Sequence, residues 1–301
     1  MEAIRLLDYG GSTWVPSFNP MIIGYMEGLL LRFIRSQEVG MRLLLLLCLV
    51  FFSTLLPASD LARERRISNE IEEMILDGEP VRLQAGGADF LAIYAKEESS
   101  YAKGAAIIIH GRGAHPDWTE VVQPMRTGLL DHGWRTLSIQ MPIASAEAPP
   151  GAYRELIPEA GPRIAAAVDY LKKMKVENIV IISHSLGARM ALEHLAAGKS
   201  QEVRALVTVG LSADKKEKES GTLGALQKLQ LPMLDIYGSQ DLQSVLGSVH
   251  ERAAAAARAK NSDYRQTRIE GADHFFLGLD DTLISTVRAW LGKVAPGRKL
   301  K

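Results

Sequence analysis

The amino-acid sequence predicts an α/β fold in which a mostly parallel central sheet carries helices on both faces. Short apolar runs alternate along the chain with segments of helical periodicity, as parallel strands joined by crossover helices do. The run at 105–110, Ala-Ala-Ile-Ile-Ile-His, is apolar without alternation, which is typical of a strand buried on both faces. Hydrophobic residues make up 47% and charged residues 23% of the chain, so disorder over most of its length is excluded.

The predicted elements follow one another in regular alternation. A charged segment at 61–75 predicts a surface helix ahead of the sheet. Strands are predicted at 90–95, 105–110, 134–141, 177–183, 203–211, 231–237 and 264–269. Helices are predicted at 117–132, 161–174, 185–197, 242–260 and 281–294.

Local signals set several of these bounds. Three prolines and the lack of a clear period make 142–151 a predicted loop. Pro162 is expected to open the next helix, because proline suits the first helical turn. Gly198 is expected to end the helix at 185–197, and 214–220 is interpreted as a solvated cluster of charges.

Charge and cysteine usage exclude several classes of protein. The 301 residues include 35 Lys+Arg and 35 Asp+Glu, so the formal net charge is zero and bulk charge gives no nucleic-acid footprint. The single cysteine, Cys48, excludes a disulfide scaffold, a Cys-x-x-Cys redox site and a cysteine-based zinc site. Because His-Glu-x-x-His, paired-carboxylate and glycine-rich nucleotide motifs are also absent, we predict no metal and no cofactor.

The N-terminal part of the chain carries an export-type signal. Residues 43–57 form an apolar run behind Arg42, shorter than the roughly 20 residues of a membrane span and close to a secretory core. A cleaved signal, an uncleaved membrane anchor and a buried helix are the three alternatives, and Met41 is a possible true start. We therefore expect an extension with a signal or anchor at 1–60, a domain at 61–301, and a periplasmic or cell-envelope location, with membrane association through 43–57 as a further possibility.

A candidate nucleophile follows the strand at 177–183. The sequence Ser183-His184-Ser185-Leu186-Gly187 runs straight into a helix and resembles the Gly-x-Ser-x-Gly nucleophile elbow. Small residues are needed two positions either side of the nucleophile, because the chain turns there too sharply for a larger side chain. Ser185 would lie at a helix N-terminus, which favours an oxyanion; the alternative is that Ser185 merely caps the helix.

A candidate carboxylate follows the strand at 231–237. Asp241 lies in the loop after that strand, where it can orient an imidazole and stabilise its cationic form. The alternative is an ordinary turn residue. Asp235 lies inside the strand and is expected to be buried, and Asp214, after the preceding strand, is a possible substitute.

A candidate general base follows the last strand. His274 lies in the loop ahead of the final helix, where it can reach the serine, and Phe275 and Phe276 are expected to anchor that loop in the core. The order Ser, Asp, His along the chain is that of an α/β-hydrolase, and differs from the chymotrypsin and subtilisin orders. His184 is not expected to be the base, because neighbouring residues on a tight turn are poorly placed for proton transfer.

The loop after the strand at 105–110 is a candidate for stabilising negative charge. The backbone N–H groups of Arg112 and Leu186 are predicted to form the oxyanion hole, while His110 supports the loop. Three residues of this region are predicted to line a substrate pocket: Gly111, His115 and Trp118. Surface packing is the alternative for His115 and Trp118, and a solvent-facing position is the alternative for the Arg112 side chain.

Four motifs resemble the α/β-hydrolase superfamily over roughly residues 85–295: HGRG at 110–113, SHSLG at 183–187, GSQD at 238–241 and GADH at 271–274. HGRGAHPDW with GWRTLSIQMP is more closely similar to a bacterial family of exported α/β-hydrolase-like proteins without an established substrate. The resemblance implies Ser185 as nucleophile, His274 as base and Asp241 as its orienting carboxylate. Ser183 departs from the usual glycine.

These residues predict a serine hydrolase of carboxylesterase type, acting on ester or thioester bonds of a small-molecule acyl substrate through an acyl-enzyme. The segment 142–160 is too short for a large helical lid, which favours an open pocket and a small or medium acyl group. The alternatives are a catalytically inactive binding or envelope-assembly protein on the same scaffold, and acyl-transfer or peptidase work by the same triad.

Overall fold

The computed structural model describes residues 59–297, which build one eight-stranded sheet in the order β1-β2-β4-β3-β5-β6-β7-β8. The apolar run at 43–57 and the extension before it lie outside these residues, so the predicted signal or anchor stays a prediction. Within 59–297, no helix is both long and apolar enough to span a bilayer.

The sheet is mixed at one edge only. Its strands are β1 (Glu79–Ala85), β2 (Ala88–Ala95), β3 (Gly104–Ile109), β4 (Trp134–Ile139), β5 (Ile179–His184), β6 (Val203–Val209), β7 (Met233–Gly238) and β8 (Tyr264–Ile269). β1 and β2 form an antiparallel hairpin, and β2 pairs antiparallel with β4. From β4 to β8 all neighbours are parallel, so the carboxyl ends of six strands share one edge.

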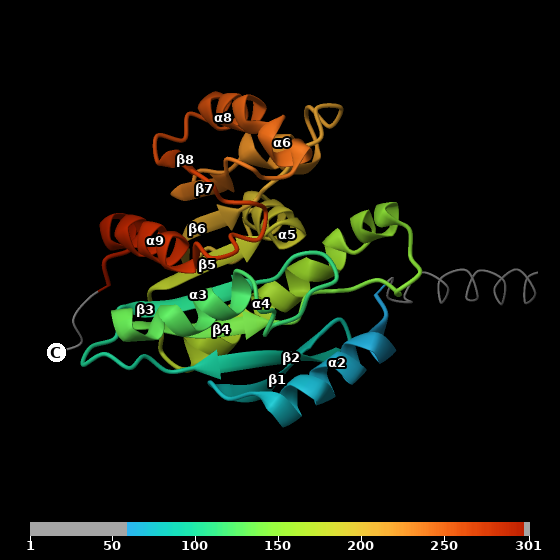
Figure 1. Cartoon of the computed structure of the whole chain (residues 1–301), viewed down its shortest axis with the longest axis vertical. Helices are drawn as coiled ribbons and strands as arrows, with labels where there is room; N and C mark the ends of the chain where they lie inside the picture. The colour runs from blue at the N-terminus through green and yellow to red at the C-terminus, as the bar shows by residue number, and fades with distance from the viewer. Residues whose placement is uncertain (1–58, 298–301) are drawn as a thin grey trace, which may run out of the picture. The chain divides into compact units, whose positions relative to one another are not determined.

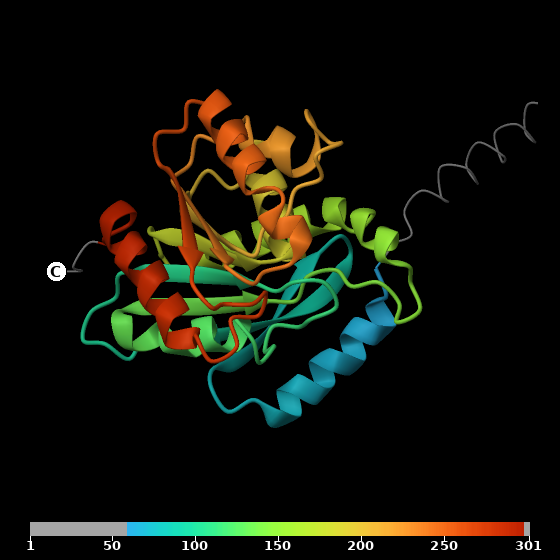
Figure 2. The same cartoon turned by 45° about the horizontal axis from the view of Figure 1, so that its top comes forward.

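Helices cover both faces of this sheet, which confirms the predicted fold class (Figures 1 and 2). The α-helices are α2 (Leu61–Met74), α3 (Val122–Gly128), α4 (Ile157–Lys173), α5 (Leu186–Ala196), α6 (Gly221–Leu226), α7 (Gln243–Leu246), α8 (Val249–Arg258) and α9 (Asp280–Val294), with 3-10 turns η2 (Leu130–His132) and η3 (Pro150–Arg154). Ile107 of β3 packs in the core beneath α4 and α5, whereas Ile108 faces α3 and α9. This alternation explains the uninterrupted apolar run of β3.

The sequence analysis predicts β2 as the strand at 90–95, but it lacks β1 and the antiparallel hairpin that β1 forms with β2. Its turn is Gly86-Gly87, and both glycines have positive φ, the conformation that short hairpin turns require. β1 is an edge strand with mostly exposed or half-buried residues, so its apolar pattern is weak.

Two predicted helices begin elsewhere. The helix expected over 117–132 starts only at Val122, because Val121 has φ 60°, outside the helical range. Arg126 Nε donates to the Asp117 carboxylate at 3.1 Å and ties the preceding loop to α3. α4 starts at Ile157, one turn before the expected site, and Pro162 lies inside it. The earlier start buries Ile157 and Ala160 in the core.

Two further helices differ in continuity or contact. The helix expected over 242–260 is interrupted between α7 and α8, where the Ser248 hydroxyl accepts a hydrogen bond from the Ala213 N–H at 3.1 Å. α2 is docked more firmly than a surface helix, because Glu64 is buried and its carboxylate accepts from the Arg163 guanidinium at 2.8 Å.

Candidate active site

Ser185 occupies a strained turn between β5 and α5. Its backbone has φ 54° and ψ −119°, a region that costs a non-glycine residue roughly 1–3 kcal/mol, and its N–H donates to the Val209 carbonyl at 2.8 Å. The Ser185 side chain makes no capping hydrogen bond to the helix. The interpretation of this serine as a simple helix cap is therefore wrong.

The residues two positions before and after Ser185 meet the steric demand of the turn. A Cβ on Gly187 would overlap the carbonyl oxygen of His110, so glycine is required there. Ser183 is 1% exposed and its hydroxyl donates to the Val207 carbonyl of β6 at 3.0 Å. The serine that replaces the usual glycine thus has room and a partner for its only polar atom.

His274 joins the hydroxyl and the carboxylate. Its Nε2 lies 2.9 Å from Ser185 Oγ, and its Nδ1 lies 2.6 Å from Asp241 Oδ1. Because a carboxylate accepts, Nδ1 carries the proton and Nε2 accepts from the serine hydroxyl. The three residues that the sequence analysis selected from three separate loops therefore form one hydrogen-bonded line.

Asp241 is held as an anion within this line. Burial by itself raises the pKa of Asp241, but hydrogen bonds from His274, the Leu242 N–H at 2.7 Å and the Gly238 N–H at 3.3 Å outweigh burial and lower the pKa below its usual value. A carboxylate that stays charged can orient the imidazole and stabilise its cationic form.

Gly210 is a site residue that the sequence analysis missed. It follows β6 directly with φ +65°, and a Cβ on it would lie 2.7 Å from Cε1 and 2.9 Å from Nδ1 of His274. The imidazole of His274 therefore packs directly against the backbone of Gly210, where a side chain would not fit. The available signal was a glycine immediately after a buried strand, a position where close approach requires the absence of a side chain.

The loop after β3 lies against Ser185. A Cβ on Gly111 would be 3.0 Å from the Cβ of Ser185. His110 holds this loop, as predicted: its Nε2 accepts from the Met141 N–H at 2.8 Å, and its Nδ1–H donates to the Gly111 carbonyl at 2.8 Å. Burial lowers the pKa of His110 to about 3, so the ring stays neutral and keeps this tautomer.

The two residues proposed for the oxyanion hole flank this contact. Leu186 is the first residue of α5, so its N–H has no partner within the helix. Arg112 follows Gly111 directly. Its side chain is exposed, with the guanidinium carbon 6.0 Å from the centre of the Tyr153 ring.

His115 and Trp118 pack on each other at the far end of the same loop. Their rings meet edge to face at 5.3 Å, and His115 Nδ1 accepts from the Asp117 N–H at 3.2 Å. Trp118 also packs against the α3–α9 side of the core. Their predicted place in a substrate pocket stays a prediction.

His184 supports the loop that carries the imidazole. Its Nε2–H donates to the carbonyl of His274 at 3.0 Å, and burial together with the nearby His274 lowers the pKa of His184 to about 4. The Ser185 hydroxyl is hydrogen-bonded to Nε2 of His274 and not to His184, in line with the sequence prediction.

The two phenylalanines after His274 behave differently from each other. Phe276 is fully buried at φ 58° and anchors the loop as predicted. The prediction is wrong for Phe275, which is 41% exposed and sets its ring 5.3 Å from that of His274. The positive φ of Phe276 turns the chain so that only one of the two rings can enter the core.

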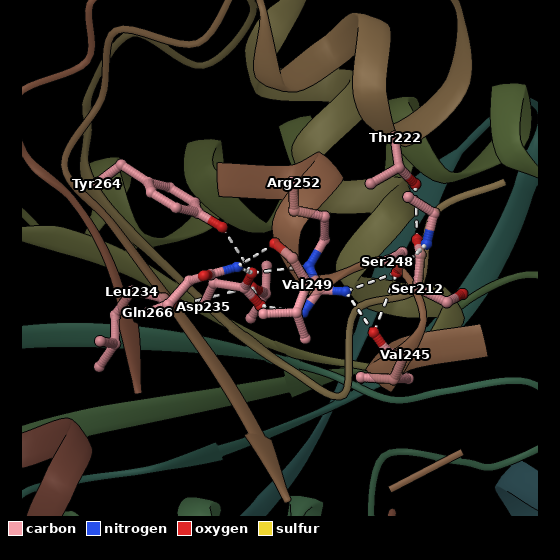
Figure 3. Close-up of polar contacts among 12 residues, drawn as sticks. Ser212, Thr222, Leu234, Asp235, Val245, Ser248, Val249, Arg252, Tyr264 and Gln266 are labelled. Carbon is pink, nitrogen blue, oxygen red and sulfur yellow. Dashed lines mark hydrogen bonds and ion pairs between the residues drawn. The ribbon is translucent and has the colours of Figure 1, made fainter. Parts of the chain in front are cut away.

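The remaining candidate carboxylates are engaged elsewhere. Asp235 is fully buried and accepts from Arg252 Nε at 2.7 Å, Tyr264 Oη at 2.7 Å and Gln266 Nε2 at 3.1 Å (Figure 3). Asp214 accepts from the Lys216 N–H in the exposed charge cluster. Within the described part of the chain, no group of three or more His, Cys, Asp or Glu residues is placed to hold a metal.

Solved structures that are similar to this chain include esterases and hydrolases. Est1E from Butyrivibrio proteoclasticus matches with a TM-score of 0.57 and 17% identity over 70% of this chain and 97% of that one. The Pyrococcus furiosus esterase Pf2001 matches with a TM-score of 0.59 and 15% identity over 75% and 94%. XC6422 from Xanthomonas campestris, described as an α/β serine hydrolase without lid, matches with a TM-score of 0.56 and 14% identity over 75% and 98%.

These similarities show that the chain has the α/β-hydrolase fold that its motifs resemble. No curated protein sequence matches the chain. One family model, described as "Protein of unknown function (DUF3530)", matches residues 56–162 and 152–293.

Proposed function

The chain belongs to this DUF3530 family of unknown function, and we propose that it is a serine hydrolase that cleaves carboxylic ester or thioester bonds of a small-molecule substrate. The observation that carries the proposal is the line from Ser185 Oγ through His274 to Asp241, with distances of 2.9 and 2.6 Å. The esterases that share the fold support the same class of reaction.

The reaction begins when Nε2 of His274 takes the proton of the Ser185 hydroxyl as its oxygen attacks the substrate carbonyl. The carbonyl π electrons move to oxygen, and the N–H groups of Leu186 and Arg112 stabilise the resulting oxyanion. Collapse expels the alcohol or thiol, which receives the proton from His274, and leaves an acyl-serine. Water then repeats the steps with His274 as base and releases the acid.

The substrate would enter from the side of the sheet edge where Gly111 lies against Ser185. In this proposal Gly111, His115 and Trp118 line the entrance. The chain between β4 and α4 forms only a short 3-10 turn, η3, which supports an accessible pocket without a large helical lid.

The test compares the full chain with its Ser185→Ala variant. A fluorophosphonate probe should label the natural chain, and a p-nitrophenyl acyl ester should be hydrolysed; both signals should vanish in Ser185→Ala with the melting temperature unchanged. Ser285→Ala, which removes an exposed hydroxyl on α9, is the matched control and should keep both.

Equal hydrolysis by Ser185→Ala would end the assignment. A natural chain that takes no label would favour the inactive binding or envelope-assembly protein. Adding alcohol or amine acceptors and analysing the products separates hydrolysis from acyl transfer, and peptide substrates test for peptidase work.

We also propose that the chain is exported by means of the apolar run at 43–57, and that the hydrolase domain spans 61–301. N-terminal sequencing of the protein recovered from periplasmic, membrane and cytoplasmic fractions tests the export and the start of the domain. A start near residue 60 supports cleavage, a start at Met1 or Met41 in a membrane fraction supports an anchor, and a cytoplasmic location contradicts export.

A further inference from the structure

A cleft of about 550 Å³ lies at the edge of the sheet opposite Ser185. Its lining includes Gly104 at the start of β3, Asn178 just before β5, and Arg204 at the start of β6. The nucleophile and its partners follow the carboxyl ends of the parallel strands, so this cleft lies at the amino ends of the same strands. Its volume falls within the range of small-molecule sites, about 300–1,000 Å³.

The lining is strongly cationic although the whole chain is neutral. Four basic side chains, Lys103, Arg135, Lys175 and Arg204, face a single acidic residue, Glu177. Only Arg135 is paired, through two contacts of its guanidinium with the Glu97 carboxylate at 2.7 and 3.2 Å. Across residues 59–297, no ion pair is formed by Lys103, Lys175 or Arg204, so the cleft keeps an excess of positive charge.

Compensation of helix ends accounts for only part of this charge. α4 and α9 both end near the cleft, where their carbonyl groups attract cations. At the end of α9, however, the Asn178 side-chain amide already serves the Ala295 carbonyl at 3.1 Å, and it also donates to the Lys103 carbonyl at 2.8 Å. Arg204 lies on a strand, so neither helix end explains its position.

We propose that this cleft binds a small polyanion carrying two or more phosphate groups, at a site separate from the hydrolase centre. Cations that form no ion pair within residues 59–297, as is the case for Lys103, Lys175 and Arg204, attract multiply charged anions when they surround one cavity. The Arg135 charge is offset by Glu97. The shared chemistry covers a free di- or polyphosphate and a phosphorylated lipid headgroup.

The test measures binding of pyrophosphate to the full chain by isothermal titration calorimetry. We expect saturable binding that weakens with added salt, and at least a tenfold loss of affinity in Lys175→Gln/Arg204→Gln. The control Lys216→Gln/Lys218→Gln removes the same charge from exposed lysines near the other edge of the sheet and should bind as the natural chain does. Ester hydrolysis should be unchanged in both variants, because neither touches the hydrolase centre.

Vesicles of phosphatidylcholine with and without phosphatidylinositol bisphosphate, whose headgroup carries more than one phosphate, distinguish the two sources of phosphate. Pyrophosphate binding without vesicle binding indicates a free ligand, and added vesicle binding that requires Lys175 and Arg204 indicates a headgroup. Failure of both probes to bind overturns the proposal. Equal weakening by the two double variants also overturns it, because the attraction would then be unspecific.

Discussion

Asp235 and Asp241 lie on and just after the same strand, β7, yet their surroundings differ in kind. The Asp235 carboxylate is fully buried and is surrounded by donors of Arg252, Tyr264 and Gln266. The Asp241 carboxylate is bound by His274, whose other ring nitrogen reaches the hydroxyl of Ser185, a half-buried residue.

The difference shows what separates a carboxylate that only stabilises the fold from one that is placed to assist proton transfer. The partner of Asp235 is a guanidinium, which never gives up its proton in a protein, and the network has no free end. The partner of Asp241 is an imidazole, which exchanges protons near neutral pH. Burial alone therefore does not identify the carboxylate of the proposed triad; the identity of its partner, and the contact of that partner with a hydroxyl, do.

The largest expected effect comes from replacing each carboxylate by an amide. Asp241→Asn should lower kcat for a p-nitrophenyl ester by about 10⁴-fold, because an amide favours the wrong tautomer of His274. Steady-state kinetics on the purified variants measure this loss. Asp235→Asn should keep kcat within about tenfold per folded molecule, and an equal loss in both variants would contradict the distinction between the two regions.

The converse experiment removes the cation from the Asp235 network. Arg252→Met should lower the free energy of unfolding by about 3–5 kcal/mol, because it leaves the buried Asp235 carboxylate without its cation. Urea unfolding measures the change. Arg204→Met, which removes an exposed arginine from the neighbouring β6, should change it by about 0.5 kcal/mol or less; a similar loss in the two variants would show that the Asp235 network has no special weight.

Sequence reasoning located the Ser185–His274–Asp241 line better than the Asp235 network, for a physical reason. Ser185, Asp241 and His274 each follow a predicted strand, and parallel strands bring such positions to one edge. The burial of Asp235 was also predictable from its place inside an apolar run. Its partner Arg252 was not, because a cation on an alanine-rich helix normally faces solvent and nothing local marks it as buried.

The other omissions concern the backbone. Gly210 supports the imidazole through the absence of a side chain, and a lone glycine after a strand is more often part of an ordinary turn. The contrast between Phe275 and Phe276 depends on one positive φ. The start of α3 likewise depends on the positive φ of Val121. These features depend on contacts between residues that are distant in the sequence, and composition and periodicity do not predict such contacts.

The next prediction concerns Gly210, whose backbone packs against the imidazole of His274. Gly210→Ala should lower kcat/KM by roughly 10²-fold, because a Cβ 2.7 Å from Cε1 displaces the imidazole from Ser185. Gly198→Ala is the matched control: Gly198 has φ +72° with no heavy atom within 4 Å of the added Cβ, so it carries the backbone strain without the collision. Kinetics on both variants separate the two causes, and equal activity losses would refute the role of Gly210.

The smallest expected effect is a dependence of the free energy of unfolding on pH that arises from His184, beside Ser185. The Asp235 network contains no histidine, whereas burial lowers the pKa of His184, which precedes Ser185, from 6.5 to about 4. Between these pH values the unfolded chain binds a proton at this residue that the folded chain does not bind. Acidification therefore favours unfolding by up to about 1.4 kcal/mol per pH unit for this residue.

Urea unfolding measured across this pH range gives the slope of the unfolding free energy against pH. This slope should be reduced by that amount in His184→Gln, whose amide can still donate to the His274 carbonyl. Arg252→Met, which lowers stability without removing a histidine, should keep the full slope; an unchanged slope in His184→Gln would mean that the pH dependence arises elsewhere, with His110 as the next residue to replace.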